Sequence, residues 1–151
     1  MNYWLMKSEP GECSVDDALA APESTVPWVG VRNYQARNFM RDGMLMGDGV
    51  LFYHSSCAEP GIVGIAQVAS APYPDPTQFD PQSPYFDAKS RPAEPRWVLV
   101  DVQVVKKTRN LTLPELRATA SLTELLVLKK GNRLSITPVT AEHWQAIARL
   151  L

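Results

Sequence analysis

The sequence predicts an α+β fold, a single domain in which five or six strands are accompanied by helices. Strand and helix patterns are mixed along the chain without regular strand–helix–strand alternation, which favours α+β over a parallel α/β sheet. The 151 residues, 45% of them hydrophobic, suffice for one domain over residues 1–151 with a sizeable core. We expect the strands to close into a barrel, because closure leaves no exposed edge.

The first 41 residues predict one strand and two helices. A short apolar run over residues 3–6 is typical of a buried strand. A serine–aspartate capping box predicts a helix over residues 14–21. Two prolines hold a loop over residues 22–32, and Asn33 is a good N-cap for a second helix that ends near Arg41.

The middle of the chain predicts a hairpin followed by a long ordered loop. Residues 49–55 and 62–68 are rich in β-branched and aromatic side chains, and a Pro-Gly pair lies between them. Residues 71–95 hold seven prolines and four acidic side chains, which is too much proline for regular structure. The loop also contains aromatic side chains that could anchor it on the domain, namely Tyr73, Phe79, Tyr85 and Phe86.

The last third of the chain predicts the longest strand, over residues 96–106, with alternate valines on one face. Two short helices are expected over 113–118 and 121–127, and another strand over 133–137. Thr140 is a good N-cap for a final helix. The side chains of that helix expected to face the core are Trp144, Ile147, Ala148 and Leu151.

Charge is unevenly distributed although the net charge is only −1. Residues 96–133 carry eight basic and three acidic side chains, a net of +5, whereas residues 42–95 carry two basic and seven acidic, a net of −5. A basic segment can form a local phosphate-binding face. Solvated lysines along strands would give the same pattern, and the sequence leaves both interpretations open.

Several classes of protein and of site are not supported. No apolar run is long enough to cross a bilayer, and no signal-peptide pattern is present, so we expect a soluble cytoplasmic protein. Cys13 and Cys57 lack the spacing of a metal or redox motif. The aspartates of the proline-rich loop lack calcium-loop spacing. We therefore expect no metal and no cofactor.

Five stretches of the chain carry a family resemblance. They are residues 4–10 (WLMKSEP), 28–38 (WVGVRNYQARN), 51–55 (LFYHS), 73–80 (YPDPTQFD) and 133–139 (RLSITPV). In this order they closely resemble the EVE domain family. The resemblance implies a PUA-like fold related to the YTH and ASCH domains, a mixed β pseudo-barrel of five or six strands with flanking helices. It also implies binding of modified bases in nucleic acid, notably methylated or hydroxymethylated cytosine in DNA.

The comparison with YTH domains implies positions for a base-binding site. Lys7 and Ser8 are similar to the Lys-Ser pair that ends the first strand there, and Trp28 is placed like the first wall of the aromatic cage. Asn33 is similar to the polar group that reads the base edge. The proline-rich loop, with Tyr73 or Phe79, would supply the second wall. The predicted ligand-binding residues are Lys7, Ser8, Trp28, Gly30, Val31, Arg32, Asn33, Asn38, His54, Ser55, Tyr73, Phe79, Trp97 and Arg133.

These residue types suit a flat ligand with polar edges. An indole face stacks on a base, and Gly30 lets the backbone approach it. Amides and hydroxyls can both donate and accept at a base edge, while Lys7, Arg32 and Arg37 could meet phosphates. Other roles remain open for the two tryptophans and the asparagine: Trp28 and Trp97 could fill the core, and Asn33 could serve only as a helix cap.

The function predicted is a non-catalytic nucleic-acid-binding module that recognises a modified base in an aromatic-lined pocket. Its partner would be nucleic acid carrying such bases, with no membrane association, and the oligomeric state is left open. A reader of modified RNA is one alternative. A small enzyme or small-molecule binder is another, in which Cys57 and His54 at a strand end would be the reactive pair.

Overall fold

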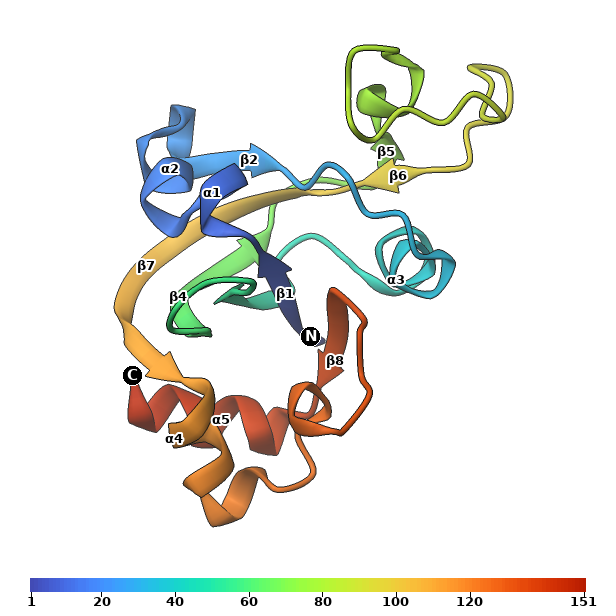
Figure 1. The fold of residues 1–151 in the computed structure, drawn as a ribbon. Helices are drawn as coiled ribbons and strands as arrows, with labels where there is room; N and C mark the ends of the chain where they lie inside the picture. The colour runs from blue at the N-terminus through green and yellow to red at the C-terminus, as the bar shows by residue number, and fades with distance from the viewer.

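The computed structural model describes all 151 residues and contains a curved six-stranded mixed sheet with helices around it (Figure 1). The sheet has the order β2-β7-β4-β3-β1-β8. Its strands are β1 Tyr3–Ser8, β2 Thr25–Pro27, β3 Gly49–His54, β4 Gly61–Val68, β7 Asp101–Thr112 and β8 Ile136–Val139. A second, two-stranded sheet pairs β5 Tyr73–Pro74 with β6 Val98–Leu99.

Five α-helices and several single turns complete the fold. The helices are α1 Pro10–Cys13, α2 Val15–Ala20, α3 Tyr34–Asn38, α4 Leu113–Ala118 and α5 Ala141–Leu150. Short 3₁₀ turns span Pro22–Ser24, Pro76–Phe79, Ala120–Leu122 and Leu126–Leu128, and a π-helical turn spans Phe39–Gly43. None of the helices is long and apolar enough to span a membrane.

The mixed sheet confirms the predicted α+β class and strand number. β1 and β3 are parallel, and the other pairs are antiparallel. The predicted closure is wrong, because β2 and β8 do not pair and remain the two edges of the sheet. Each edge strand contains a proline, Pro27 or Pro138. The result is a strongly curved pseudo-barrel that stays open on one side (Figure 1).

Alternate residues of the central strands enter two hydrophobic clusters. Met6 and Phe52 belong to the larger cluster with residues of α2 and α3, whereas Leu5 and Leu51 belong to the smaller one with residues of α4 and α5. The period of two along each strand produces this division, because successive side chains point to opposite faces. Both faces of the central sheet are therefore buried.

Local chemistry accounts for the helix starts. Ser14 and Asp17 form the predicted capping box of α2, and Asn33 accepts a hydrogen bond from the backbone N–H of Ala36 as the predicted N-cap of α3. Each cap satisfies a backbone donor that has no partner inside its helix. Thr140 caps α5 in the same way.

Five expectations about the elements were wrong. The loop expected over residues 22–32 contains the short strand β2. The strand expected over residues 96–106 is divided into β6 and β7, and β7 runs on to Thr112. The strand expected over 133–137 begins later, as β8. The helix expected over 121–127 is replaced by two 3₁₀ turns, and Leu122 and Leu125 are buried. Ala148 of α5 is exposed rather than in the core.

Candidate functional site

A cleft of about 800 Å³ opens where the parallel strands β1 and β3 end. This volume lies in the range typical of small-molecule sites, roughly 300–1,000 Å³. The cleft is lined by Lys7, Ser8, Glu9, Glu12, Cys13, Val26, Pro27, Trp28, Val29, Gly30, Val31, Arg32, Asn33, Ser55, Ser56, Pro84, Tyr85, Arg133 and Ser135. Five segments that are distant in sequence therefore meet here, and the lining combines apolar, hydroxyl and charged groups.

The structure brings many of the predicted ligand-binding residues to this one cleft. Those that line it are Lys7, Ser8, Trp28, Gly30, Val31, Arg32, Asn33, Ser55 and Arg133. Those that do not line it are Asn38, His54, Tyr73, Phe79 and Trp97. The lining residues come from the three motifs near residues 7, 30 and 55 and from the segment before β8.

Trp28 is a core residue with one part at the cleft. The residue is only 6% exposed, and its ring packs edge-on against Phe52 with centroids 5.3 Å apart. Its backbone N–H donates to the carbonyl of Val100 at 3.0 Å. The expectation of an indole face standing open at the cleft mouth is therefore wrong. The small exposed part of Trp28 contributes to the apolar wall of the cleft.

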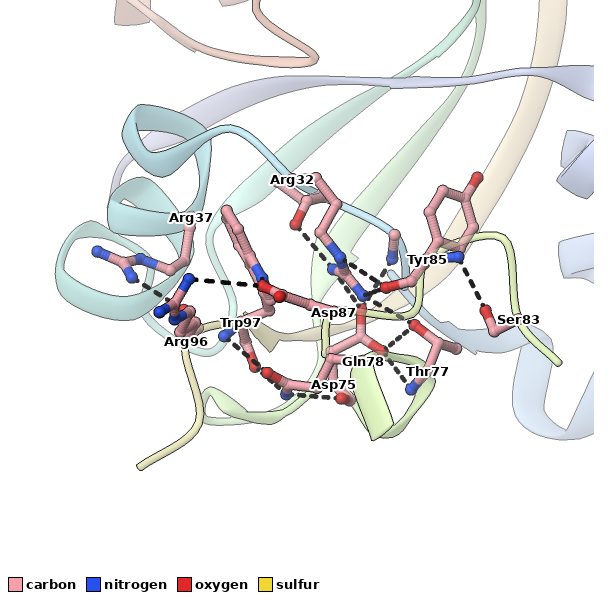
Figure 2. Close-up of polar contacts among 12 residues, drawn as sticks. Arg32, Arg37, Asp75, Thr77, Gln78, Ser83, Tyr85, Asp87, Arg96 and Trp97 are labelled. Atoms are coloured by element: carbon pink, nitrogen blue, oxygen red, sulfur yellow. Dashed lines mark hydrogen bonds and ion pairs between the residues drawn. The ribbon is translucent and has the colours of Figure 1, made fainter. Parts of the chain in front are cut away.

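Arg32 lies at the cleft but has no N–H group left for a ligand. Its Nε donates to the carbonyl of Tyr85, its Nη1 to Val31 and Asp75, and its Nη2 to Thr77 and Tyr85 (Figure 2). Because a guanidinium has five N–H donors, this set commits all of them. The expected phosphate contact of Arg32 is therefore wrong, and the side chain instead joins the loop before α3 to the proline-rich loop.

The proline-rich loop is ordered, as predicted, around the buried side chain of Gln78. The amide nitrogen of Gln78 donates to the carbonyls of Asp75 and Trp97, both at 2.7 Å. Its amide oxygen accepts from the hydroxyl of Ser90 and from the backbone N–H of Trp97. Buried backbone groups of an irregular segment are thereby satisfied, as a packed loop requires.

The two aromatic side chains expected to form the second wall lie elsewhere. The hydroxyl of Tyr73 donates to Asp101 at 2.6 Å, and burial together with this hydrogen bond raises the pKa of Tyr73 to about 12. Phe79 is half-buried in a 3₁₀ turn. Tyr73 thus anchors the proline-rich loop on β7. Neither residue lines the cleft, so the assignment of either one to the cleft wall is wrong.

Tyr85 supplies that wall instead. Its ring lies against Gly30, where a Cβ atom would be 2.6 Å from Tyr85 Cζ, and the φ of Gly30 is +86°. Its hydroxyl donates to the carboxylate of Glu12, at 2.7 and 2.6 Å from the two oxygens. Burial and then this hydrogen bond raise the pKa of Tyr85 to about 12. The proline-rich loop thus reaches the cleft through a tyrosine that the sequence indicated only as an anchor.

Trp97 and Asn38 are occupied with structural contacts away from the cleft. The indole N–H of Trp97 donates to Asp87 at 2.8 Å, and the residue is 5% exposed. The side-chain oxygen of Asn38 accepts from Nε and Nη2 of Arg37. Of the two roles left open for Trp97, the structure shows the core role. The assignment of Asn38 to the ligand site is wrong because Asn38 does not line the cleft.

His54 is also a structural group. Its Nε2 accepts the backbone N–H of Val15 at 3.1 Å, so the neutral ring carries its proton on Nδ1. Burial lowers the pKa of His54. Neither ring nitrogen is then free to accept a proton from Cys57, and no cluster of three or more metal-ligating side chains is present. These contacts remove the general base that the enzyme alternative required.

Several polar groups of the cleft make no hydrogen bond or ion pair within the protein. The ammonium of Lys7 is one of them; it lies 6.0 Å from the ring centroid of Tyr53, and burial lowers the pKa of Lys7. The guanidinium of Arg133 and the hydroxyls of Ser55 and Ser56 are likewise unpaired. The amide nitrogen of Asn33 is free because its cap uses only the oxygen. An acceptor-rich ligand would satisfy the cations, and the amide and hydroxyls could read an edge.

Ser56 is a cleft residue that sequence reasoning missed. Its φ is +53°, in the left-handed region that non-glycine residues seldom adopt. A serine held there costs on the order of 1 kcal/mol or more, and such strain is concentrated at functional sites. The only sequence feature that could have indicated Ser56 is its position directly after residues 51–55, one of the five stretches that resemble the EVE family.

Comparison with known proteins shows where the chain belongs. The EVE domain family model matches residues 2–150. The chain belongs to the EVE domain family. Mouse thymocyte nuclear protein 1 is 41% identical to this EVE domain over 166 residues, which cover 99% of this chain and 73% of the mouse protein. The family expected from the five sequence stretches is confirmed.

Solved structures agree with this EVE domain throughout its length. A crystal structure of a protein from Pseudomonas putida is 50% identical, with a TM-score of 0.92 over 98% of both chains. A crystal structure of human THYN1 in complex with DNA containing 5-methylcytosine is 40% identical, with a TM-score of 0.93 over 99% of this chain and 97% of that one. An ASCH protein from Zymomonas mobilis, 9% identical with a TM-score of 0.55, shares the fold alone. The PUA-like fold is thereby confirmed.

Proposed function

We propose that this EVE domain is a non-catalytic reader of methylated cytosine in DNA, which takes the modified base, extruded from the helix, into the cleft. The observation that carries the proposal is the unpaired Lys7 ammonium. It is half-buried in a cleft that also holds an apolar wall and free edge-reading groups. A 40% identical protein, human THYN1, has been crystallised with DNA that contains 5-methylcytosine.

The chemistry of the cleft fits an extruded nucleotide. A flipped base needs an apolar or aromatic contact for its faces and polar groups for its Watson–Crick edge. Tyr85 and Pro27 supply the first, and Asn33 and Ser55 the second. The cations Lys7 and Arg133 favour a ligand that also carries phosphate. Against catalysis stands His54, whose ring nitrogen is committed to a backbone N–H.

The test is a binding panel on the purified protein. Matched duplexes with cytosine, 5-methylcytosine or 5-hydroxymethylcytosine at one position, and RNA of the same sequences, would be titrated by fluorescence anisotropy. A buried methyl group contributes about 0.8 kcal/mol, so we expect roughly a fourfold preference for the methylated duplex. Lys7→Met and Arg133→Gln should each weaken binding, whereas Arg149→Gln, which removes an exposed charge outside the cleft, should not.

Three results would contradict this proposal. Equal affinity for modified and unmodified duplexes would remove the reader function. A stronger preference for modified RNA than for modified DNA would favour the RNA alternative. Loss of binding in Arg149→Gln as large as in Arg133→Gln would mean that only overall charge matters.

A further inference from the structure

Tyr34 forms an exposed aromatic platform beside the cleft. The residue is 52% exposed, yet its ring stacks on the buried Trp97, with centroids 4.7 Å apart and planes 22° apart. Its hydroxyl makes no hydrogen bond within the protein. Tyr34 follows Asn33, which lines the cleft, and consecutive Cα atoms lie about 3.8 Å apart.

The platform is held rigidly from below. The backbone N–H of Trp97 donates to Gln78 and its indole N–H to Asp87, so the ring under Tyr34 is fixed. The guanidinium carbon of Arg37 lies 4.7 Å from the Tyr34 ring centroid, and its Nη1 donates to the carbonyl of Arg96 at 2.8 Å. Figure 2 shows Trp97 between Arg32 and Arg37, whose guanidinium groups lie 5.3 and 5.9 Å from its centroid.

We propose that Tyr34 stacks on the nucleotide next to the one held in the cleft. The inference rests on the proposed function, because extruding one base leaves its neighbours without a stacking partner. A ring whose inner face covers Trp97 retains an outer face for such a base, and it loses little entropy on binding because it is already fixed. Stacking on an aromatic side chain is worth about 1–3 kcal/mol per base.

The surroundings favour a nucleotide over a protein partner. The neighbours of Tyr34 on the chain, Asn33 and Gln35, are both exposed and polar. Arg37 uses three of its five N–H donors, for Asn38 and Arg96, and keeps two for a phosphate beside the stacked base. A flat ring with a flanking cation is the arrangement that single-stranded nucleic-acid sites use.

The experiment compares Tyr34→Leu with Tyr34→Phe. Leucine still covers Trp97 but lacks a flat face, whereas phenylalanine keeps the face. Affinities would be measured for the methylated duplex and for 5-methyl-dCMP, which has no neighbouring nucleotide. We expect Tyr34→Leu to weaken duplex binding at least about fivefold, the equivalent of 1 kcal/mol, and to leave 5-methyl-dCMP binding unchanged. Tyr34→Phe should match the wild type with both ligands.

A fluorescent base gives a second measurement that a purely structural role would not change. With 2-aminopurine placed next to the modified cytosine, stacking on Tyr34 should quench emission, and Tyr34→Leu should restore it. Unchanged duplex affinity in Tyr34→Leu, or equal weakening with both ligands, would overturn the inference. If the inference about Tyr34 is overturned but Lys7→Met still weakens duplex binding, the proposed function remains supported without it. A wild type that binds no modified oligonucleotide would overturn both.

Discussion

The guanidinium of Arg32 lies 3.1 Å from the carboxylate of Asp75, whose side chain is fully buried. The same carboxylate accepts the backbone N–H of Gly30 at 2.8 Å and both the N–H and the hydroxyl of Thr77. One ion pair, with Asp75 fully buried and Arg32 partly buried, therefore joins a cleft-lining loop to the proline-rich loop. The shape of the cleft depends on this pair, although neither charge is available to a ligand.

Replacing Arg32 by Gln should destabilise the fold strongly. Removing one partner of a buried ion pair leaves an uncompensated charge and costs about 3–5 kcal/mol. Urea denaturation would measure the free energy of unfolding. The control is Arg91→Gln, whose partner Glu94 is exposed, and it should change stability by no more than about 0.5 kcal/mol. Adding Asp75→Asn to Arg32→Gln should recover part of the loss, and equal effects of the two arginine variants would contradict the prediction.

Gly30→Ala should cost more stability than Gly131→Ala. Both glycines have positive φ, +86° and +80°, which costs an L-residue roughly 1–2 kcal/mol. Only Gly30 faces a ring, that of Tyr85, whereas nothing lies within 4 Å of the position a Cβ would take at Gly131. The difference between the two losses in urea denaturation measures the Tyr85 contact. Gly30→Ala should also weaken DNA binding, and an identical effect of both variants on stability and binding would be evidence against the wall assigned to Tyr85.

DNA affinity should fall at alkaline pH through Lys7. Burial lowers the pKa of Lys7 below 10.5, and a phosphate binds the protonated form. The contribution of Lys7 to affinity is therefore complete below the lowered pKa and is lost as the pH rises through it. Titrations from about pH 7 upwards should show the decline beginning at a lower pH than for a lysine with the ordinary pKa of 10.5. Lys7→Arg stays charged throughout, so its affinity should be flatter with pH, and parallel curves for the two proteins would exclude this assignment.

Stability should decrease below pH 6.5 through His54. Burial lowers the pKa of His54 below 6.5, and its Nε2 accepts a backbone N–H. At pH values between 6.5 and the lowered pKa, the unfolded chain binds a proton that the folded chain does not. The free energy of unfolding therefore falls as the pH falls through that window. Urea denaturation at about pH 7.5 and about pH 5.5 should show a smaller difference for His54→Gln than for the wild type or for His143→Gln.

Local sequence chemistry predicted the fold well but the site only in part. The caps at Ser14 and Asn33 and the alternate valines of β7 depend on near neighbours, and all three were confirmed. The family resemblance correctly implied the PUA-like fold. The matched stretches also brought many of the expected residues to one cleft, because β1 and β3 are parallel and end at the same side of the sheet.

The errors concern side chains whose partners are far away in sequence. The donors of Arg32 are taken by Asp75, Thr77 and Tyr85, which are 43 to 53 residues distant. The burial of Trp28 and Trp97 likewise depends on packing that no local pattern records. The sequence motifs therefore indicated where the cleft is. Long-range contacts determine which cleft residues remain free to bind a ligand.

The prolines of β2 and β8 also bear on how copies of this protein meet. Pro27 and Pro138 lie on the two outermost strands, and each lacks the N–H group that an incoming strand would require. A strand from a second copy therefore cannot form a continuous set of backbone hydrogen bonds with either edge strand. Such edge-to-edge strand addition is a common route to fibrous aggregation. The sheet can therefore have two unpaired edges without promoting aggregation by strand pairing between copies.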